Sequence, residues 1–357
     1  MRVAILGVGL IGGSIGLAAR GRAGAEVCGY DPDAAVRAKA LELGAIDMQA
    51  PDVAAAVASA DVVFVAAPVG ALGESVRIAL AAAGPDCVVS DVGSTKRVLA
   101  NAAADERFVG GHPLAGAETA GVENAREDLF DGATWYLTPA KSSTAGVLYE
   151  RLHRLLSRFG ARPTAIDADT HDRLMASVSH LPHVLANLLV SQTASLLGEE
   201  SERLPAVGPS FRDATRVAGA NSAIWTDIYM SNRDALIAGI DELAGRLHDV
   251  RGWLAAEDAP AVTAWNERAR AERERLLGTG LVGGPVHELR ASVPNRPGVI
   301  AEIALALGGA GVNIVDMVLS PSHDNRQGVV ALWIAGDEHA RRARELIADL
   351  GFPVVRA

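Results

Sequence analysis

The sequence is poor in aromatic residues and in positive charge, and each shortage argues against a class of partner. Aromatic residues make up 4% of the 357 residues, so the chain offers few rings on which nucleic-acid bases could stack. The formal net charge is −10, which repels phosphate backbones and anionic membrane surfaces alike. We therefore expect no nucleic-acid partner and no membrane partner.

Cysteine is scarce as well. Cys28 and Cys87 lie in short apolar runs, which favours buried free thiols over a disulfide and fits a reducing, cytoplasmic location. The first residues read as a strand and a glycine-rich turn rather than as a signal peptide. No other stretch comes near the ~20 unbroken apolar residues of a membrane span. Hydrophobic residues make up 49% of the chain, which is enough to build two or three domains.

Three kinds of pattern follow one another along the chain. Over residues 1–166, short apolar runs such as VAILG and DVVFVAAP alternate with alanine-rich segments, which predicts a doubly wound α/β domain with a parallel sheet covered on both faces. Over residues 167–280, apolar residues recur at every third or fourth position, which predicts an all-helical domain. Residues 286–357 show the order strand, helix, strand, strand, helix, strand, so a small α+β domain closes the chain.

The turn GVGLIG after the first apolar run predicts a Rossmann-type dinucleotide site. Gly7 allows a tight turn, Gly9 lets a pyrophosphate approach the backbone, and Gly12 lets the next helix pack on the sheet. Asp31 ends the second predicted strand, where a carboxylate binds ribose hydroxyls and repels a 2′-phosphate, so we expect NAD rather than NADP. The nearest cation of that loop, Arg37, is expected further on in a helix. The residues of the turn assigned to the cofactor are Gly7, Gly9, Leu10, Ile11 and Gly12.

Polar residues follow the other predicted strands of this domain. The motifs AAPV, SDVGSTK and GGHPLAG place Pro68, Ser94, Lys96 and His112 where the carboxyl ends of strands meet, so we expect them near the nicotinamide. His112 is the candidate base, because imidazole titrates near neutral pH and an apolar surrounding keeps it neutral. Glu118 either counters that pKa shift or gates the entrance. The structural alternatives are a core histidine for His112 and an N-cap of a helix TKRVLANAAA for Ser94.

A second polar cluster lies in the predicted helical domain. His180 and His183 share one helical face, and Pro182 between them should kink the helix and turn His183 away from the regular track. No third ligand stands at a suitable spacing, so no metal is expected. Arg212 and Arg216 either form a solvated face or bind a carboxylate in bidentate fashion.

Several longer motifs, taken in order, resemble the prephenate/arogenate dehydrogenase family; they are GVGLIGGS, DVGSTK, GGHPLAGAETAGVENA, HDRLMASVSHLPHVLAN and FRDATRVAGANSAIWTDI. The segment VPNRPGVIAEIALALGGAGVNIVDM resembles an ACT regulatory domain of ferredoxin-like fold. The resemblance implies NAD-dependent oxidative decarboxylation of prephenate to 4-hydroxyphenylpyruvate in tyrosine biosynthesis, or of arogenate to tyrosine. It also implies that the helical domain forms a homodimer and completes the substrate pocket. Asp213 and Trp225 fall within these motifs as supporting residues.

The resemblance implies a role for each polar candidate. The base on the ring hydroxyl is His112, its helper is Ser94, the ligand of a substrate carboxylate is Arg216, the residue that orients the substrate is His183, and the residue at the pocket mouth is Glu118.

In the ACT-like domain, the expected regulatory residues lie around the start of its first helix. Pro297 and Gly298 open that helix, so free backbone amides there can receive the carboxylate of an amino acid. Asn295 and Asn313 offer polar partners. We expect tyrosine or phenylalanine as the effector, and the alternative is an appendage that only stabilises the protein or its dimer.

Two other functions remain open from the sequence. A β-hydroxyacid dehydrogenase shares the order of a Rossmann domain and a helical domain, but it lacks the HPLAG histidine motif and generally relies on a lysine of the helical part. The other possibility is a sensor that holds NAD and binds an amino acid through its last domain.

Overall fold

The structure is a computed structural model, and it describes residues 1–100, 102–116, 119–139, 147–197, 207–278, 285–294, 296, 299, 302–303, 306–307, 310, 312, 314–321 and 327–356. The chain divides into two compact units, Met1–Ala244 and Gly245–Ala357. The boundary falls inside helix α10 (Arg233–Ala255), so the three domain limits expected from the sequence stay a prediction.

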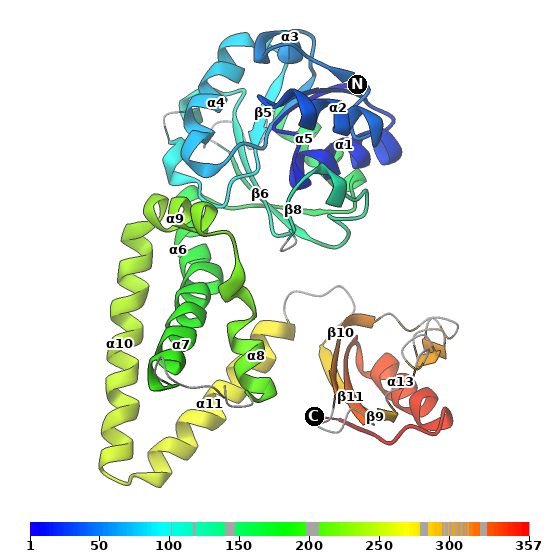
Figure 1. Cartoon of the computed structure of the whole chain (residues 1–357). Coiled ribbons are helices and arrows are strands. Elements are labelled where there is room, and N and C mark those ends of the chain that lie inside the picture. The colour runs from blue at the N-terminus through cyan, green and yellow to red at the C-terminus, as the bar shows by residue number, and fades with distance from the viewer. Residues whose placement is uncertain are drawn as a thin grey trace. The chain divides into compact units, whose positions relative to one another are not determined.

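The first unit begins with a five-stranded sheet of order β3-β2-β1-β4-β5 (Figure 1). All its neighbours are parallel, and β1 pairs with both β2 and β4. The strand order reverses beside β1, and ligands of open α/β sheets bind at the carboxyl ends of the strands next to such a reversal. The five strands are β1 (Arg2–Leu6), β2 (Glu26–Tyr30), β3 (Met48–Gln49), β4 (Val62–Val65) and β5 (Val88–Asp91).

Both faces of this sheet are covered by helices, as predicted. Successive side chains of β1 point to opposite faces: Val3 and Ile5 pack in a core with α1 and α5, and Ala4 and Leu6 pack in a core with α3 and α4. All four side chains are buried. The helices of this layer are α1 (Leu10–Ala23), α2 (Ala34–Glu42), α3 (Val53–Val57), α4 (Val69–Ala82) and α5 (Val147–Arg158).

The strand expected at RFVGGHP forms, but it does not extend the parallel ladder. β6 (Val109–Pro113) belongs to a second sheet of order β6-β7-β8, in which β7 (Thr134–Pro139) is antiparallel to β6 and parallel to β8 (Arg162–Ala165). A single parallel bridge between Val89 and Phe108 joins the two sheets. The described residues between β6 and β7 hold a 3₁₀ turn and no crossover helix, so β7 returns antiparallel to β6. The predicted parallel sheet is confirmed over β1–β5, and the second sheet departs from it at β7.

The helix expected at TKRVLANAAA is also absent from the described residues there. Two 3₁₀ turns, Arg97–Leu99 and Ala102–Ala104, take its place. The backbone amides of Lys96 and Arg97 donate to the carboxylate of Asp172, and the Lys96 side chain is buried, so this segment follows its tertiary partners instead of its helical propensity. Ser94 consequently does not cap a helix.

The described residues from 168 to 278 are helical apart from their connections, which confirms the predicted all-helical region. A π-helical turn, Ala176–His180, lies between α6 and α7, just before Pro182. Proline removes a backbone donor and clashes with the preceding turn, and the wider π turn accommodates it, while the predicted kink stays a prediction. The helices are α6 (Ala168–Met175), α7 (Leu181–Leu197), α8 (Pro209–Thr215), α9 (Ser222–Ser231), α10 and α11 (Ala259–Gly278).

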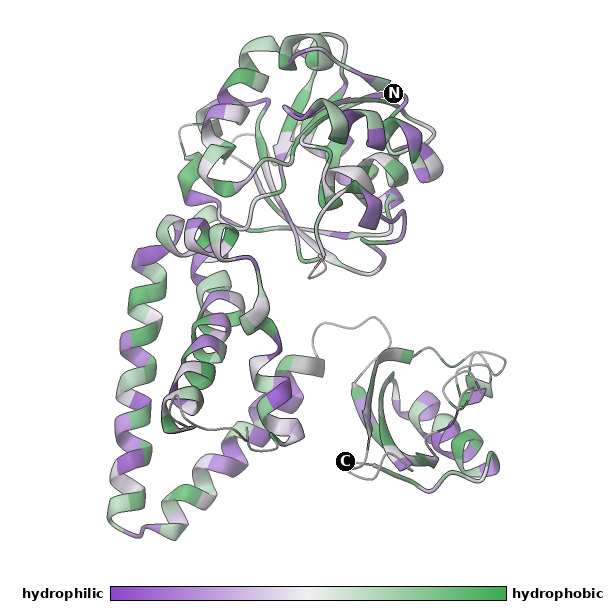
Figure 2. Ribbon diagram, viewed as in Figure 1, coloured by the Kyte–Doolittle hydropathy of each residue, from purple (hydrophilic) through white to green (hydrophobic). Residues whose placement is uncertain are grey.

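The run Ala168–Leu196 is 29 residues long and apolar enough to cross a membrane, judged by length and composition alone. The run joins three successive helical elements, and polar residues such as Asp169, Asp172 and Arg173 interrupt it, so it is not a stretch of ~20 unbroken apolar residues and does not contradict that expectation. The criterion is weak evidence for a membrane span. The same run buries His171, Asp172 and His180, and the Asp172 carboxylate binds amides of the α/β part. Figure 2 shows that hydrophobic and hydrophilic residues are interspersed along this run.

The second unit contains a four-stranded antiparallel sheet of order β10-β11-β9-β12. α13 (Asp337–Asp349) packs on it, and Ala343 and Ile347 of this helix share a core with Leu289 and Val330. The described elements follow the predicted order, with helical residues between β9 and β10. The strands are β9 (Val286–Pro294), β10 (Ile314–Pro321), β11 (Gln327–Ala335) and β12 (Val354–Arg356).

Both cysteines are free thiols, as expected. Cys87 is buried, and burial raises the pKa of its thiol to about 11. Cys28 is only half-buried, on β2 opposite Met48 of the short edge strand β3.

Candidate active site

The glycine turn at the end of β1 has the geometry of a dinucleotide site. Gly7 has a φ of +96°, and a Cβ there would stand 2.5 Å from the carbonyl oxygen of Ala66. A Cβ on Gly12 would stand 1.9 Å from the carbonyl oxygen of Gly7, so the start of α1 packs directly on the turn. A Cβ on Gly9 would meet nothing within 4 Å. The open space at Gly9, next to the N-terminus of α1, is where a pyrophosphate fits.

Asp31 is held at the end of β2 beside this turn. Its carboxylate accepts the backbone N–H of Val8 at 3.1 Å and that of Asp33 at 3.0 Å. The carboxylate is thus oriented and keeps lone pairs for ribose hydroxyls. Arg37, which was expected to lie away in a helix, is in α2, but its guanidinium returns to the Asp31 carbonyl and lies 5.9 Å from the ring centroid of Tyr30. The repulsion of a 2′-phosphate by Asp31 is therefore partly offset by a nearby cation.

Pro68 follows β4 and precedes α4, as the expected cofactor edge requires. The first turn of α4 has no side-chain cap from its own N-cap residue. Asp227 of α9 takes this place, because its carboxylate accepts the backbone N–H of Gly70 at 3.2 Å. The helical part of the first unit is therefore attached to the cofactor edge of the α/β part.

A buried ion pair under β6 fixes the backbone next to His112. The ammonium of Lys96 and the carboxylate of Asp91 are 1% and 0% exposed and contact one another. Asp91 accepts the N–H of Gly111 at 3.0 Å, and Lys96 donates to the carbonyl of Gly111 at 2.6 Å. Burial lowers the pKa of Lys96, and Asp91 opposes that shift. A Cβ on Gly111 would stand 2.5 Å from the Asp91 carbonyl oxygen, so the glycine before His112 allows β6 to approach Asp91 this closely.

The ring of His112 contacts a second, fully buried histidine. Nδ1 of His112 lies 2.9 Å from Nε2 of His171, and Nδ1 of His171 lies 2.8 Å from Oδ1 of Asp172. His171 and Asp172 are 0% exposed, whereas His112 is half-buried. The ring of Tyr136, opposite His112 on β7, packs edge-on against His171 with centroids 5.7 Å apart.

The surroundings of His112 keep it neutral. Burial lowers its pKa well below the usual 6.5, and its neighbours His171, Lys96 and His180 lower it further. A neutral imidazole at the edge of the cofactor sheet can accept a proton at physiological pH. The sequence predicted a lowered pKa from an apolar surrounding; burial is indeed the main cause of the shift, and histidine and lysine neighbours add to it.

His183 lies in a second cluster, built by α7 and α9. Its ring stacks on Trp225 with centroids 3.6 Å apart and planes 5° apart. Nδ1 of His183 contacts the hydroxyl of Tyr229 and lies 3.3 Å from Nδ2 of Asn187. Because the amide nitrogen can only donate, Nδ1 is the acceptor and Nε2 carries the hydrogen.

The Nε2 atom of His183 is buried and has no hydrogen-bond partner of good geometry among the described residues. Burial lowers the pKa of His183, and the nearby carbonyl of Val217 opposes that shift. Nε2 thus carries a buried N–H donor inside this cluster.

The remaining predicted site residues are Ser94, Arg212, Arg216 and Glu118. Ser94 is half-buried in the turn after β5, and no hydrogen bond joins it to His112 within the described part of the chain. Arg212 and Arg216 are exposed, on α8 and at its C-terminal end. Glu118 lies outside the described residues. Its role at the pocket mouth stays a prediction, as do those of Ser94 and Arg216.

Sequence reasoning missed His171, Asp172 and Tyr229. His171 and Asp172 stand at the head of the motif HDRLMASVSHLPH, but adjacent residues of a helix carry no signal of a shared partner. Their contacts to His112 and Lys96 span 59 and 76 positions of the chain. In the described residues, no group of three or more His, Cys, Asp or Glu side chains could hold a metal ion.

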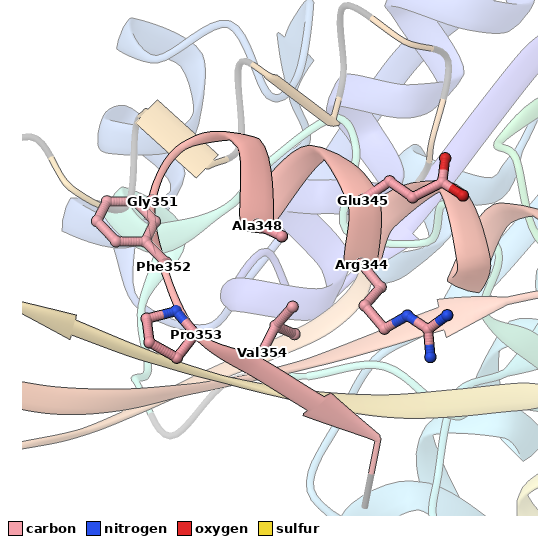
Figure 3. A pocket seen from close by; sticks show the side chains of 7 residues that line it. All are labelled: Arg344, Glu345, Ala348, Gly351, Phe352, Pro353 and Val354. Atoms are coloured by element: carbon pink, nitrogen blue, oxygen red, sulfur yellow. The ribbon is translucent and has the colours of Figure 1, made fainter.

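The predicted regulatory residues Asn295, Pro297, Gly298 and Asn313 all lie outside the described residues. The described part of this domain has an open hollow of about 570 Å³ between the C-terminal end of α13 and β12. Figure 3 shows Phe352 and Pro353 at one end of it and Arg344 and Glu345 at the other.

A dehydrogenase with a nicotinamide cofactor is the class of protein that this sheet edge and its neutral histidine define. Three family models match the chain: the nucleotide-binding domain of prephenate dehydrogenase over residues 15–164, its dimerization domain over residues 167–267, and the ACT domain over residues 287–350. The chain belongs to the prephenate dehydrogenase family and is an NAD-dependent oxidoreductase. The β-hydroxyacid dehydrogenase and sensor alternatives are thereby set aside.

Relatives of known name support the same family. The prephenate dehydrogenase of Bacillus subtilis is 31% identical over 97% of this chain and 95% of its own length. The cyclohexadienyl dehydrogenase of Zymomonas mobilis is 32% identical over 72% of this chain and 89% of its own.

Two solved structures are similar to this chain in fold as well. Prephenate dehydrogenase from Aquifex aeolicus, in complex with hydroxyphenyl propionate and NAD+, has a TM-score of 0.71 at 29% identity and covers 77% of this chain and 98% of its own. Arogenate dehydrogenase from Synechocystis has a TM-score of 0.68 at 25% identity and covers 77% of this chain and 100% of its own.

Proposed function

We propose that this enzyme catalyses the oxidative decarboxylation of prephenate to 4-hydroxyphenylpyruvate, a step of tyrosine biosynthesis. The observation that carries the proposal is the neutral imidazole of His112 beside the cofactor edge of the sheet. The ring hydroxyl of prephenate must lose a proton as its carbon loses a hydride, and a positioned base makes that loss fast.

Each group of the site has its own part in the reaction. The glycine turn and Asp31 would hold NAD, which would supply the acceptor for the hydride of the ring carbon. His112 accepts the hydroxyl proton, so the C–O bond becomes a carbonyl. The bond from the ring to its carboxylate then breaks, carbon dioxide leaves, and the electron pair of that bond makes the ring aromatic. The carbonyl oxygen regains a proton as the phenol forms. Ser94 assists at the hydroxyl, and Glu118 acts at the pocket mouth.

Arg216 binds a carboxylate of the substrate. Its guanidinium is exposed at the end of α8, and a guanidinium binds a carboxylate through two parallel hydrogen bonds. Since the whole protein carries a net charge of −10, a dianionic substrate needs local cations of this kind.

Prephenate and arogenate differ in a side-chain keto group versus an amino group. The N–H donor at Nε2 of His183 suits a keto oxygen, which accepts, and not an ammonium group, which also donates. This favours prephenate. Arogenate remains the second candidate, because the structural relatives include an arogenate dehydrogenase.

The deciding measurement is NADH formation from each substrate, with kcat/KM determined for prephenate and arogenate and for NAD and NADP. We expect the highest value for prephenate with NAD. His112→Asn should lower kcat about 10²- to 10⁴-fold, because it removes the proton acceptor and keeps the fold. A His112→Asn variant with kcat within a few-fold of wild type would overturn the assignment of the base.

Arg216→Ala should act on KM instead. Removing one partner of a desolvated charge pair costs about 2–5 kcal/mol, or roughly 30- to 5000-fold in affinity. Arg173→Ala, an exposed arginine on α6, is the matched control with unchanged KM. An unchanged KM in Arg216→Ala would return Arg216 to a solvated face.

We further propose that the protein is a cytoplasmic homodimer. Several large apolar side chains of α7 are exposed in the single chain, namely Leu188, Leu189, Val190 and Leu196. The dimerization family model covers this helix, and a partner helix would bury these side chains. Free thiols are compatible with a reducing compartment.

The ACT domain is proposed to bind tyrosine or phenylalanine and to regulate the dehydrogenase. Amino-acid end products are the economical effectors of a biosynthetic step. Isothermal calorimetry with each amino acid tests this directly, and no binding to the intact protein would refute the sensor function.

A further inference from the structure

Asp172, His171 and His112 form a linear chain of hydrogen bonds that ends at the base. Nδ1 of His171 lies 2.8 Å from Oδ1 of Asp172, and its Nε2 lies 2.9 Å from Nδ1 of His112. We propose that His171, oriented by Asp172, is a positioning residue that fixes the tautomer of His112 and leaves the Nε2 lone pair free for the substrate proton. This inference rests on the proposed function, in which His112 is the base.

The direction of donation along these hydrogen bonds is set by Asp172. An ionised carboxylate can only accept hydrogen bonds. The Asp172 oxygens accept the amides of Lys96 at 2.8 Å and Arg97 at 3.0 Å, besides Nδ1 of His171. Burial raises the pKa of Asp172, but these donors outweigh burial and bring it below its usual value. Nδ1 of His171 must therefore carry a hydrogen and donate it.

The tautomer of His112 follows from that of His171. A neutral imidazole with a hydrogen on Nδ1 has an acceptor at Nε2. Nε2 of His171 therefore accepts, and Nδ1 of His112 has to donate to it. The hydrogen of neutral His112 then sits on Nδ1, and its Nε2 is the acceptor. A His112 ring with the hydrogen on Nε2 would place two lone pairs face to face at 2.9 Å.

Packing prevents the two rings from leaving this arrangement. His171 is 0% exposed, and Tyr136 packs edge-on against it at 81°. The rings of His112 and His171 meet at 71°, with centroids 5.1 Å apart. On the other side, Lys96 and Asp91 hold both backbone groups of Gly111. The base is thus held through its ring and through its strand.

The same hydrogen bonds also hold His112 after it has taken the proton. When Nε2 of His112 takes the hydroxyl proton, the ring becomes an imidazolium that still has its hydrogen on Nδ1. The hydrogen bond to His171 is kept, and the carboxylate of Asp172 lies one ring away from the new charge. The base need not turn during the step, which keeps the reacting atoms aligned.

Two measurements on His171→Phe test the proposal. The phenyl ring keeps a planar group in the buried site and removes both nitrogens. We expect kcat with prephenate to fall about 10²- to 10⁴-fold, the range for a base whose proton transfer is impaired, while KM changes less than about threefold. His153→Phe on α5, whose ring contacts Tyr149 and not this cluster, should leave kcat and KM unchanged.

The second measurement is independent of activity. ¹⁵N NMR of protein labelled at histidine separates the two neutral tautomers by the shifts of the ring nitrogens, and His112→Asn assigns the His112 signals. In the wild type without substrate, His112 should carry its hydrogen on Nδ1. In His171→Phe, this preference should be lost, whereas His153→Phe should leave it in place.

The outcomes separate the positioning of His112 by His171 from the proposed function. If wild-type His112 carries its hydrogen on Nε2, the proposed positioning of His112 by His171 is wrong, even where His171→Phe does not fold. A folded His171→Phe with wild-type kcat, or with low kcat and an unchanged His112 tautomer, also overturns it. If the wild-type protein shows the Nδ1–H tautomer but oxidises neither prephenate nor arogenate, the proposed function fails and the positioning of His112 by His171 stands.

Discussion

At the scale of single residues, the proposed role of His112 as the base sets the pH range that we expect for the enzyme. The base accepts a proton only while it is neutral, and its pKa lies well below 6.5, first because of burial and then because of the charges around it. Protonation of His112 therefore begins only at pH values well below 6.5. We expect kcat/KM to hold its value through pH 6.5 and to fall further down, which a pH–rate profile measures.

Unfolding has to be followed over the same range. Burial lowers the pKa of His180 to about 4. The unfolded chain binds a proton at His180 below about pH 6.5, and the folded protein does so only near pH 4, so stability falls as the pH falls between these values. Circular dichroism at each pH separates lost structure from a lost base. An acid limb near or above pH 6.5 in folded protein would contradict the environment described for His112.

The hydroxyl of Tyr229 offers a residue-scale test of substrate choice. It contacts Nδ1 of His183 and helps to keep the hydrogen on Nε2. In Tyr229→Phe, one hydrogen bond worth about 0.5–1.5 kcal/mol is lost, so the ratio of kcat/KM for prephenate over arogenate should fall about 2- to 12-fold. Tyr149→Phe on α5 is the control. An unchanged ratio would show that Tyr229 has no part in choosing the substrate.

At the scale of elements, two glycines of the same turn should separate folding from cofactor binding. Gly12→Ala brings a Cβ to 1.9 Å from the Gly7 carbonyl oxygen, so α1 must shift and stability should fall by about 1–3 kcal/mol or more. Gly9→Ala meets nothing within 4 Å, and its φ of −74° suits alanine, so stability should be kept. Its methyl group fills the space for the pyrophosphate, and the Kd for NAD should rise.

Thermal unfolding and NAD titration of both variants check this contrast. The contact between β1 and α1 is wrongly described if Gly12→Ala is as stable as the wild type. The cofactor placement is wrong if Gly9→Ala binds NAD as the wild type does.

At the scale of the whole molecule, the ACT domain has its own core and should be separable from the chemistry. Leu289, Val330 and Ile347 belong to a core cluster made only of residues beyond 286. A protein that ends at Gly284 should keep the kcat of the intact enzyme and lose any response to tyrosine or phenylalanine. Coupling between the two sites is expected to be worth about 1–3 kcal/mol, or 5- to 150-fold in substrate affinity. Inhibition that persists after the deletion would place the effector in the active site.

The sequence by itself determined the elements whose signal is local. The glycine turn, Asp31 at the end of β2, the order of an α/β, a helical and an ACT-like region, and the place of His112 near the end of a strand could all be predicted, because each is set by neighbouring residues or by a period. The same local reasoning failed at TKRVLANAAA, where the amides of Lys96 and Arg97 have a distant partner.

Only the tertiary structure decided how the base is held. The buried pair of Lys96 and Asp91 lies under β6, and the Asp172 carboxylate reaches both the 3₁₀ turn after β5 and the ring of His171. The contacts of Asp172 with the Lys96 amide and of His171 with His112 join positions 76 and 59 apart, and no periodicity encodes them. They form because burial leaves each donor and acceptor without water, so each must find its partner within the protein.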